Sequence, residues 1–346
     1  MNRCDRLRQS MMEDEAVLIT SCPNIFYYSG FTSEDAKIVI TKSQQMLFTD
    51  SRYTIQARLE AKGFDIYDKA DDFKKAIKGL ECKIICFEEE ALSVAQYEKL
   101  KAFGKELKPF SKEIKKPRET KDSAELRKIA EAERLGDEAF SYILKHISVG
   151  RTEKEIASEL EFFMRKNGAS ALSFETICAS GVRSAMPHGT ASDKVIKKGD
   201  FVTLDFGCIL DGYCSDMTRT IVMGTPSQKQ KEIYDVVLKA QISAINAVKC
   251  GARCADCDMA ARKIIEDAGY GNNFGHGTGH SVGIEIHESP NLSPKSDAIL
   301  QAGNVVTVEP GIYIDGFGGV RIEDLVQIND QNTENLTKSV KDLIII

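Results

Sequence analysis

Histidine is scarce in this chain, and its placement is uneven. The sequence contains five histidines, and three of them, His276, His280 and His287, fall in the segment GHGTGHSVGIEIHESP. A fourth, His188, lies in the segment SAMPHGT. Imidazole ligates metals and transfers protons near neutral pH, and both uses need acidic or polar partners. The clustering therefore predicts a site and raises the question of which carboxylates belong to it.

Carboxylates occur at matching places in two similar segments. GDFVTLDFG and GNVVTVEPG align without a gap and pair Asp205 with Glu309. Asp216 follows the first segment in GYCSDMTRT, and Glu323 follows the second in GGVRIEDLV. A single buried acid is usually a hydrogen-bonded core residue. Burying an acidic side chain in an apolar strand costs free energy, however, unless a hydrogen bond or a positive charge compensates for it. The repeat predicts two duplicated halves that bring four carboxylates together, where two divalent cations would supply the missing positive charge.

The elements that position these residues follow from periodicity and turn signals. The first part of the chain is expected to contain, in order, two strands joined by a turn in AKIVITKSQQMLFTD, a helix in SRYTIQARLEAKGF, a strand in KIICFEEE and a helix in SVAQYEKLKAFG. The charged stretch SKEIKKPRETKDS (111–123) contains a proline and is predicted to be a linker. An α/β domain is expected before it.

Beyond this stretch the pattern changes. SAELRKIAEAERLGDEAFSYILKHI predicts a long helix. The helix in TEKEIASELEFFMRKNG is expected to begin with a capping box formed by Thr152 and Glu155 and to end at Asn167 and Gly168. From residue 174 onward the chain is rich in strands and loops, with one further helical region at about 228–268.

Composition limits the classes of function. The 346 residues, 42% apolar and 28% charged, are typical of a soluble globular protein long enough for two domains. A net charge of −6 gives no basic face for nucleic acid. No apolar run reaches the length of about 18 residues that a membrane span needs. The N-terminus MNRCDRLRQSMMEDE lacks the apolar region of a secretory signal, so a cytoplasmic location is expected.

Three of the ten cysteines form a motif that could bind metal. Cys250, Cys254 and Cys257 stand in CGARCADC, a spacing that can hold an iron–sulfur cluster on three thiolates. The motif runs directly into DMAARKIIEDAGY, which has the pattern of an amphipathic helix. We therefore predict reduced thiols on a helix and no cluster.

Several segments together resemble a known family. SGVRSAMPHGT, VTLDFGCILDGYCSDMTRT, GHGTGHSVGIEIHESP, VVTVEPGIY and GVRIED resemble, in order, the catalytic motifs of the pita-bread metallopeptidases, in the branch of Xaa-Pro aminopeptidases and prolidases. The resemblance implies an α+β fold whose C-terminal pita-bread catalytic domain, residues 116–346, contains an internal pseudo-twofold repeat. A smaller creatinase-type α/β domain, residues 1–115, would precede it and serve packing, dimerisation and substrate gating. NIFYYSGF and TDSRY resemble this first domain.

The resemblance also implies a set of five metal ligands. Asp205 would bind one ion, His280 and Glu309 the other, and Asp216 and Glu323 would bridge the two. Four carboxylates and a neutral imidazole cancel the charge of two divalent ions. The oxygen-rich set favours Mn²⁺, and Co²⁺, Zn²⁺ and Fe²⁺ also suit it. A water held between the ions as hydroxide would attack the substrate.

The remaining roles follow from the same resemblance. His188 and His287 would contact the substrate and stabilise the tetrahedral intermediate, and His276 would assist proton movement. Glu309 would shuttle protons as well as bind metal. Tyr313 and Arg321 complete the expected substrate-binding residues, with Arg321 able to bond an active-site carboxylate.

Three functions are compatible with these residues. The first expectation is a homodimeric dinuclear-metal aminopeptidase that releases the N-terminal residue from peptides with proline second. The alternative is an Xaa-Pro dipeptidase (prolidase), and the third is a peptide-binding module that has lost its metals, although all five ligands are present. A dipeptidase must bind the terminal carboxylate, which favours a fixed arginine near the leaving proline. Apart from Arg321, the motifs offer Arg183 and Arg219, neither clearly placed for this, so the aminopeptidase is favoured.

Overall fold

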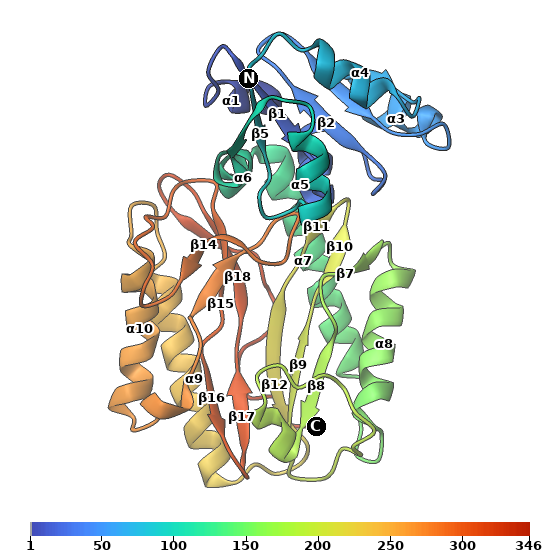
Figure 1. Cartoon of the computed structure of the whole chain (residues 1–346). Coiled ribbons are helices and arrows are strands. Elements are labelled where there is room, and N and C mark those ends of the chain that lie inside the picture. Colours follow the sequence, from blue (N-terminus) through green and yellow to red (C-terminus); the bar gives the residue numbers. More distant parts are fainter. Residues whose placement is uncertain (1) are drawn as a thin grey trace. The chain divides into compact units, whose positions relative to one another are not determined.

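The computed structural model describes residues 2–346, and the chain forms two compact units. The first unit ends at Arg118, and the second runs from Glu119 to Ile346 (Figure 1). The boundary expected between residues 115 and 116 falls inside helix α6 (Ser111–Glu119), slightly before this division.

The first unit is built on a six-stranded mixed sheet with the order β4-β3-β2-β1-β5-β6. β2 pairs antiparallel with β1 and β3, and the other neighbours are parallel. Before α6, its elements are α1 (Arg3–Arg8), β1 (Glu15–Ile19), α2 (Cys22–Ser29), β2 (Lys37–Ile40), β3 (Gln45–Phe48), α3 (Thr54–Glu60), β4 (Asp65–Tyr67), α4 (Asp72–Gly79), β5 (Ile84–Phe87), α5 (Val94–Lys101) and β6 (Glu106–Pro109). The two strands and the helix–strand alternation expected here are therefore present.

The predicted linker at 111–123 is wrong, because most of this stretch is helical. α6 contains Pro117, yet it buries Ile114 completely. The hydroxyl of Tyr28 donates to the carbonyl oxygen of Ile114 at 2.7 Å, and that of Tyr27 donates to the carbonyl oxygen of Pro117 at 3.0 Å. Packing of this face outweighs the polar composition, which by itself favours a linker.

The second unit contains the motif segments. Its elements are α7 (Ser123–Ile143), α8 (Glu153–Lys166), β7 (Ala171–Leu172), β8 (Ile177–Ser180), the 3₁₀ helix η1 (Gly181–Ala185), β9 (Phe201–Phe206), β10 (Cys208–Leu210), β11 (Tyr213–Cys214), β12 (Met217–Val222), α9 (Gln228–Ala247), α10 (Cys254–Asp267), the 3₁₀ helix η2 (Gly271–Asn273), β13 (Gly279–Ser281), β14 (Glu288–Leu292), β15 (Val305–Val308), β16 (Gly311–Ile314), β17 (Gly318–Arg321), β18 (Asp324–Ile328) and β19 (Thr333–Asn335).

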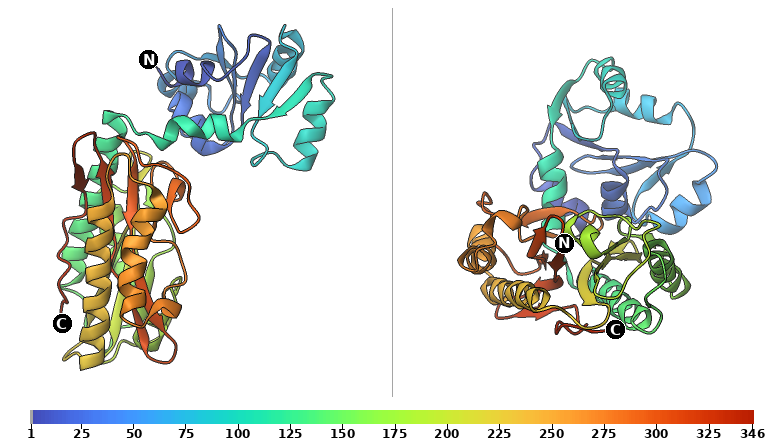
Figure 2. Two further views of the ribbon diagram at one scale, coloured as in Figure 1. Left: turned by 90° about the vertical axis from the view of Figure 1, so that its left-hand side faces the viewer. Right: turned by 90° about the horizontal axis from the view of Figure 1, so that it is seen from below.

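This unit uses one arrangement twice. β9 pairs antiparallel with β12, and β15 pairs antiparallel with β18. The apolar side chains of β8, β9 and β12 pack with α7 and α8, whereas those of β15, β17 and β18 pack with α9 and α10. Figure 1 shows these helix pairs on opposite sides of the unit, and Figure 2 (left) shows α9 and α10 running side by side. The duplicated strand motif in the sequence thus corresponds to two helix-covered halves.

Helix boundaries agree with the sequence signals in part. α8 begins with the predicted capping box, in which Thr152 and Glu155 exchange side-chain and backbone bonds, and it ends at Asn167. The single helical region expected at 228–268 is instead two helices, α9 and α10. Gly251 lies between them with a φ of +84°, a left-handed conformation that favours glycine and lets the chain reverse. Among residues 2–346, no helix is both long and apolar enough to cross a membrane.

Candidate active site and metal ligands

The predicted ligands come from equivalent places in the two halves. Asp205 lies in β9, and Asp216 immediately precedes β12. Glu309 immediately follows β15, and Glu323 lies between β17 and β18. His280 lies in β13, which pairs with β15. The ends of the repeated strands therefore carry the four acids, as the alignment of the two segments predicted.

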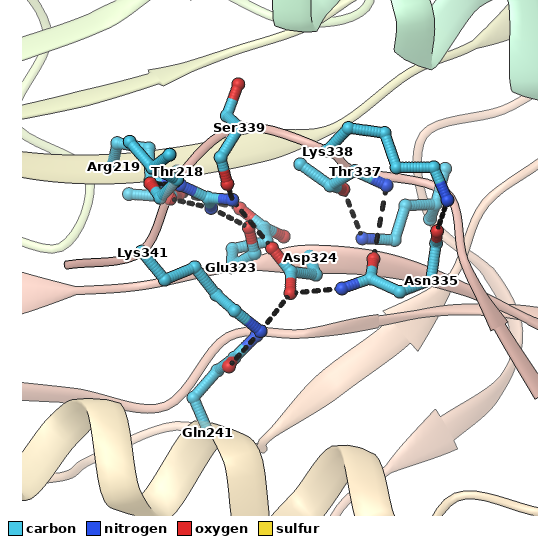
Figure 3. A network of polar contacts seen from close by, with 12 residues as sticks. Thr218, Arg219, Gln241, Glu323, Asp324, Asn335, Thr337, Lys338, Ser339 and Lys341 are labelled. Carbon is cyan, nitrogen blue, oxygen red and sulfur yellow. Dashed lines mark hydrogen bonds and ion pairs between the residues drawn. The ribbon is translucent and has the colours of Figure 1, made fainter.

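Bonds from β12 to the residues at the start of β18 join the halves next to these acids. The backbone nitrogen of Glu323 donates to the carbonyl oxygen of Thr218 at 3.1 Å, and the Thr218 hydroxyl donates to the Glu323 carboxylate at 2.6 Å. Beside them, the Arg219 guanidinium donates to Asp324 at 2.8 Å, and Lys341 donates to the same carboxylate at 2.7 Å (Figure 3). Arg219 is thus a buried structural partner and does not line the cavity described below.

Several of the predicted ligand atoms lie close together. The Nε2 atom of His280 is 3.4 Å from Oδ2 of Asp216 and 3.4 Å from Oε1 of Glu309. Single ligand atoms of Asp216, His280 and Glu323 lie within 4.8 Å of one another. Oδ1 of Asp205 is buried and has no hydrogen-bond partner in the described part of the chain. Oxygen and imidazole donors in this arrangement suit divalent ions, so the residues present fit a metal centre.

The pKa values of these groups reflect uncompensated burial. Burial raises the pKa values of Asp216 and Glu323 well above their usual range, and the neighbouring carboxylates add to the effect. Burial likewise raises the pKa of Glu309 to about 7. Burial lowers the pKa of His280 to about 4, so this imidazole is neutral at pH 7. Acids that would otherwise have to keep protons are good ligands for cations, because a cation supplies the missing charge.

The ring of His280 is oriented by its neighbours. Its Nδ1 lies 3.2 Å from the carbonyl oxygen of Ser281, which places the proton on Nδ1 and leaves the lone pair of Nε2 facing the acids. The backbone nitrogen of His280 donates to Oγ1 of Thr307 at 3.0 Å, and that hydroxyl donates to Glu309 at 3.2 Å. Thr307 therefore links two of the predicted ligands. Sequence reasoning missed it, although it lies in β15, two residues before Glu309.

A second chain of bonds leads from Asp205 to His276. Arg321, which is buried, forms an ion pair with Asp205 and donates to the Tyr313 hydroxyl at 2.9 Å. This hydroxyl lies 3.0 Å from Nε2 of His276, and Nδ1 of His276 lies 2.8 Å from the carbonyl oxygen of Gly277. The carbonyl fixes the proton on Nδ1, so Tyr313 donates to Nε2. Burial lowers the pKa of His276 to about 4, which keeps the ring neutral.

A cavity of about 710 Å³ opens over these groups. Its lining contains every predicted ligand and four predicted substrate or proton-transfer residues, namely His188, Asp205, Asp216, His276, His280, His287, Glu309, Arg321 and Glu323. Tyr313 is not part of the lining and touches it through His276 and Arg321. The lining also includes Phe174, Glu175 and Asn291, which the sequence did not single out.

The loop that carries His188 is held by Glu153, the first residue of α8. The buried Glu153 carboxylate accepts bonds from the backbone nitrogens of Ser180 at 2.7 Å and Ser192 at 3.1 Å. It also accepts a bond from Nε of Arg183 at 3.0 Å. Arg183 is therefore occupied in shaping the loop and is not part of the cavity lining. The role of Glu153 depends on partners 27 to 39 residues away, so the sequence gave no local signal for it.

The cysteine motif lies apart from the cavity. Cys254 and Cys257 are buried in α10, and Cys250 is exposed in the turn before it. Cys257 donates to the carbonyl oxygen of Ala247 at 3.5 Å. Cys254 and Cys257 therefore agree with the expectation of thiols on a helix, whereas Cys250 lies outside it.

Comparisons with known proteins cover both units. Residues 127–330 match the metallopeptidase family M24, and residues 3–120 match the creatinase/prolidase N-terminal domain. The chain is 41% identical over 334 residues to an Xaa-Pro dipeptidase of Pyrococcus horikoshii, covering 95% of this chain and 94% of the relative.

Solved structures give the same result. An Xaa-Pro dipeptidase from Bacillus anthracis matches with a TM-score of 0.97 and 44% identity over 99% of both chains. An X-Pro aminopeptidase from Thermotoga maritima matches with a TM-score of 0.93 and 39% identity over the whole of both chains. These matches confirm the predicted two-domain fold and the hydrolase class. The chain belongs to metallopeptidase family M24 and carries a creatinase/prolidase N-terminal domain before its catalytic domain.

Proposed function

We propose that this protein is a metal-dependent peptidase that hydrolyses Xaa-Pro bonds, with Xaa-Pro dipeptides as its main substrates. The observation that carries the proposal is the convergence of His280 with Asp216 and Glu309 at 3.4 Å beside Glu323. The dipeptidase reading, which was the alternative from the sequence, is supported by the names of relatives at 41% and 44% identity. The aminopeptidase, the first expectation, has support from one relative at 39% identity.

The five ligands would hold two divalent ions, for which we propose Mn²⁺. When bound, such a pair polarises a carbonyl group and lowers the pKa of a bound water. The assignment of Asp205 to one ion, of His280 and Glu309 to the other, and of Asp216 and Glu323 to both is part of this proposal. The pairing of Arg321 with Asp205 supports it, because it fixes one ligand in place without blocking the unpaired Oδ1.

The protein's own groups have distinct tasks in this proposal. Glu309 accepts a proton from the attacking water and delivers it to the leaving nitrogen, a role that suits a carboxylate in the cavity wall. His188 and His287 line the cavity and donate to the substrate carbonyl as charge develops on it. His276, kept neutral and bonded to Tyr313, completes the wall and assists proton movement.

Acceptance of longer peptides is the second candidate function. In the described part of the chain, Arg321 is the one arginine that lines the cavity, and it is already paired with Asp205. The described residues of the cavity lining therefore offer no unengaged arginine for the terminal carboxylate of a dipeptide. This observation favours cleavage of longer Xaa-Pro peptides, as by an aminopeptidase.

A length series separates the two candidates. Metal-free protein reconstituted with Mn²⁺ is assayed on Ala-Pro, Ala-Pro-Ala and Ala-Pro-Ala-Ala, with Ala-Ala as the control for the proline requirement. A dipeptidase has its highest kcat/KM on Ala-Pro and loses at least about tenfold on the tripeptide. Equal or better cleavage of the longer peptides would establish the aminopeptidase instead. If no Xaa-Pro peptide is cleaved with any of Mn²⁺, Co²⁺, Zn²⁺ or Fe²⁺, both candidates are wrong.

We also propose a homodimer, in which the N-terminal unit contributes to packing and to substrate gating. Light scattering of the active, metal-loaded protein measures its mass, for which one chain is 38.3 kDa. A mass of a single chain under assay conditions would refute this part of the proposal.

A further inference from the structure

A buried lysine contacts the residues that follow two of the site histidines. The Nζ of Lys121 donates to Oγ of Ser281 at 3.0 Å and to Oε2 of Glu288 at 3.2 Å. Ser281 directly follows His280, and Glu288 directly follows His287. The side chains of Lys121 and Glu288 are 1% and 7% exposed, so the pair is shielded from solvent and each charge needs the other.

The backbone between these strands is irregular at this point. β13 and β14 pair antiparallel, with His280 opposite Asn291 and Ser281 opposite Glu288. The register shifts between His280 and Ser281, so β14 carries additional residues there. Because a bulge disrupts the regular ladder, backbone pairing alone does not determine how the strands lie at the histidines. Lys121 bridges the pair of residues that follows the shift.

Glu288 in turn shapes the segment that leads to His287. Its Oε1 accepts bonds from the backbone nitrogens of Ile284 at 3.0 Å and Glu285 at 3.2 Å. A Cβ atom at Gly283 would approach the Glu288 carboxylate to 2.5 Å, so the turn closes tightly around this group. The position of the Glu288 carboxylate therefore influences where His287 lies.

Lys121 is itself firmly held. Its backbone nitrogen donates to the carbonyl oxygen of Gly303 at 2.8 Å. The Ser281 hydroxyl that accepts from Lys121 donates to the carbonyl oxygen of Val305 in β15, the strand that leads to Glu309. The ammonium group thus connects β13, which carries His280, and β14, which begins directly after His287, to the strand before a predicted ligand.

We propose that Lys121 is a positioning residue for the imidazoles of His280 and His287. Their ring centroids lie 4.4 Å apart at an interplanar angle of 70°, which keeps Nε2 of His280 towards the acids and His287 in the cavity wall. Lys121 maintains this geometry through Ser281 and Glu288, without touching substrate or metal. The inference rests on the proposed function only in assigning His280 to the metal and His287 to the substrate.

A buried ion pair that serves stability alone would predict a different outcome. Its removal would lower the free energy of unfolding and leave the metal affinity of the folded protein unchanged. Loss of a group that orients a metal ligand instead weakens metal binding, typically about 10- to 100-fold. Metal affinity is therefore the property that separates the two roles.

The test uses Co²⁺ as the probe, because its visible absorbance reports the ligand geometry. The full-length variants are Lys121→Met, Glu288→Gln, their combination, and the control Lys194→Met. Lys194 makes the same kinds of contact, donating to Ser180 at 2.6 Å and Asp200 at 2.7 Å, and neither partner adjoins a histidine. Co²⁺ dissociation constants come from absorbance titration, and kcat and KM are measured on Ala-Pro.

We expect Lys121→Met to bind Co²⁺ at least about tenfold more weakly, with an altered absorbance spectrum and a fall in kcat larger than the change in KM. The combined variant should be no worse than the worse single variant, because both substitutions break one interaction. Lys194→Met should bind Co²⁺ within about twofold of the wild type. If Lys121→Met binds Co²⁺ as tightly as Lys194→Met does, Lys121 is a folding residue only and the proposal is wrong.

Two further comparisons keep the result interpretable. If Lys121→Met does not fold, Ser281→Ala removes one contact of the ammonium and keeps the ion pair with Glu288, and it should weaken Co²⁺ binding several-fold. An unchanged Co²⁺ affinity in this variant would also overturn the proposal. Because the titration needs no substrate, a wild-type protein that binds Co²⁺ but cleaves no Xaa-Pro peptide would refute the proposed function alone.

Discussion

Removing the metal should make the stability of this protein fall as the pH rises. Burial raises the pKa values of Asp216 and Glu323 well above their usual range, so the folded, metal-free protein holds protons that the unfolded chain releases. Where the folded state binds more protons than the unfolded state, the free energy of unfolding decreases with increasing pH. Bound cations remove this dependence, because the acids are then ionised in the folded state as well.

The size of the effect follows from the proton count. Each acid that stays protonated in the folded state lowers the free energy of unfolding by about 1.4 kcal/mol per pH unit, or about 2 kcal/mol between pH 6.5 and 8. Glu309, whose pKa is raised by burial from 4.5 to about 7, contributes in the lower part of this window. His276 and His280 have lowered pKa values, and their stabilising effect is lost only as the pH falls below about 6.5. The window above pH 6.5 therefore isolates the acids.

The assay is urea unfolding of the chelator-treated protein at pH 6.5, 7.25 and 8, followed by circular dichroism because the chain has no tryptophan. The Mn²⁺-dependent transition reports the catalytic unit. We expect a loss of at least about 2 kcal/mol over the window without metal and little change with saturating Mn²⁺. Asp216→Asn should reduce the pH dependence of the metal-free protein by about 2 kcal/mol while abolishing stabilisation by Mn²⁺ and nearly all hydrolysis. A metal-free protein equally stable at pH 6.5 and 8 would refute the reasoning.

Three further outcomes are expected. Glu175 is an exposed acidic residue of the cavity lining. Removing its negative charge in Glu175→Gln should lower kcat/KM for the cationic substrate Lys-Pro about fivefold relative to Leu-Pro. An equal loss on both peptides would contradict this. Arg321→Met leaves Asp205 without its buried partner. It should reduce the free energy of unfolding of the metal-free protein, measured with urea, by about 3–5 kcal/mol. A loss below about 1 kcal/mol would be incompatible with the ion pair. Cys254→Ser should leave visible absorbance and iron content unchanged, whereas bleaching of a brown protein would reveal a cluster at the three cysteines.

Several features could be predicted from the sequence because they depend on short-range patterns. The matched segments around Asp205 and Glu309 record the duplicated strands directly, since each acid keeps its place at the end of an apolar run. The capping box of Thr152 and Glu155 involves residues three positions apart, so the start of α8 is visible locally. Five motifs in order then identified the family, and with it the predicted ligands that line one cavity.

The tertiary structure determines which charged side chains form ion pairs or hydrogen bonds, and which residues are their partners. Arg183 and Arg219 were candidate readers of a substrate carboxylate until their partners, Glu153 and Asp324, were seen 30 and 105 residues away. Lys121 contacts residues 160 and 167 positions later, which no periodicity can reveal. The physical reason is that burying an unpaired charge costs free energy, so each buried charged side chain is paired with a group of opposite charge or a hydrogen-bond partner. That partner can be far away in the sequence, because the packing of the whole unit determines which side chains are buried together. Local sequence patterns therefore predicted many of the residues that line the cavity, and packing of the whole unit determined their charged neighbours.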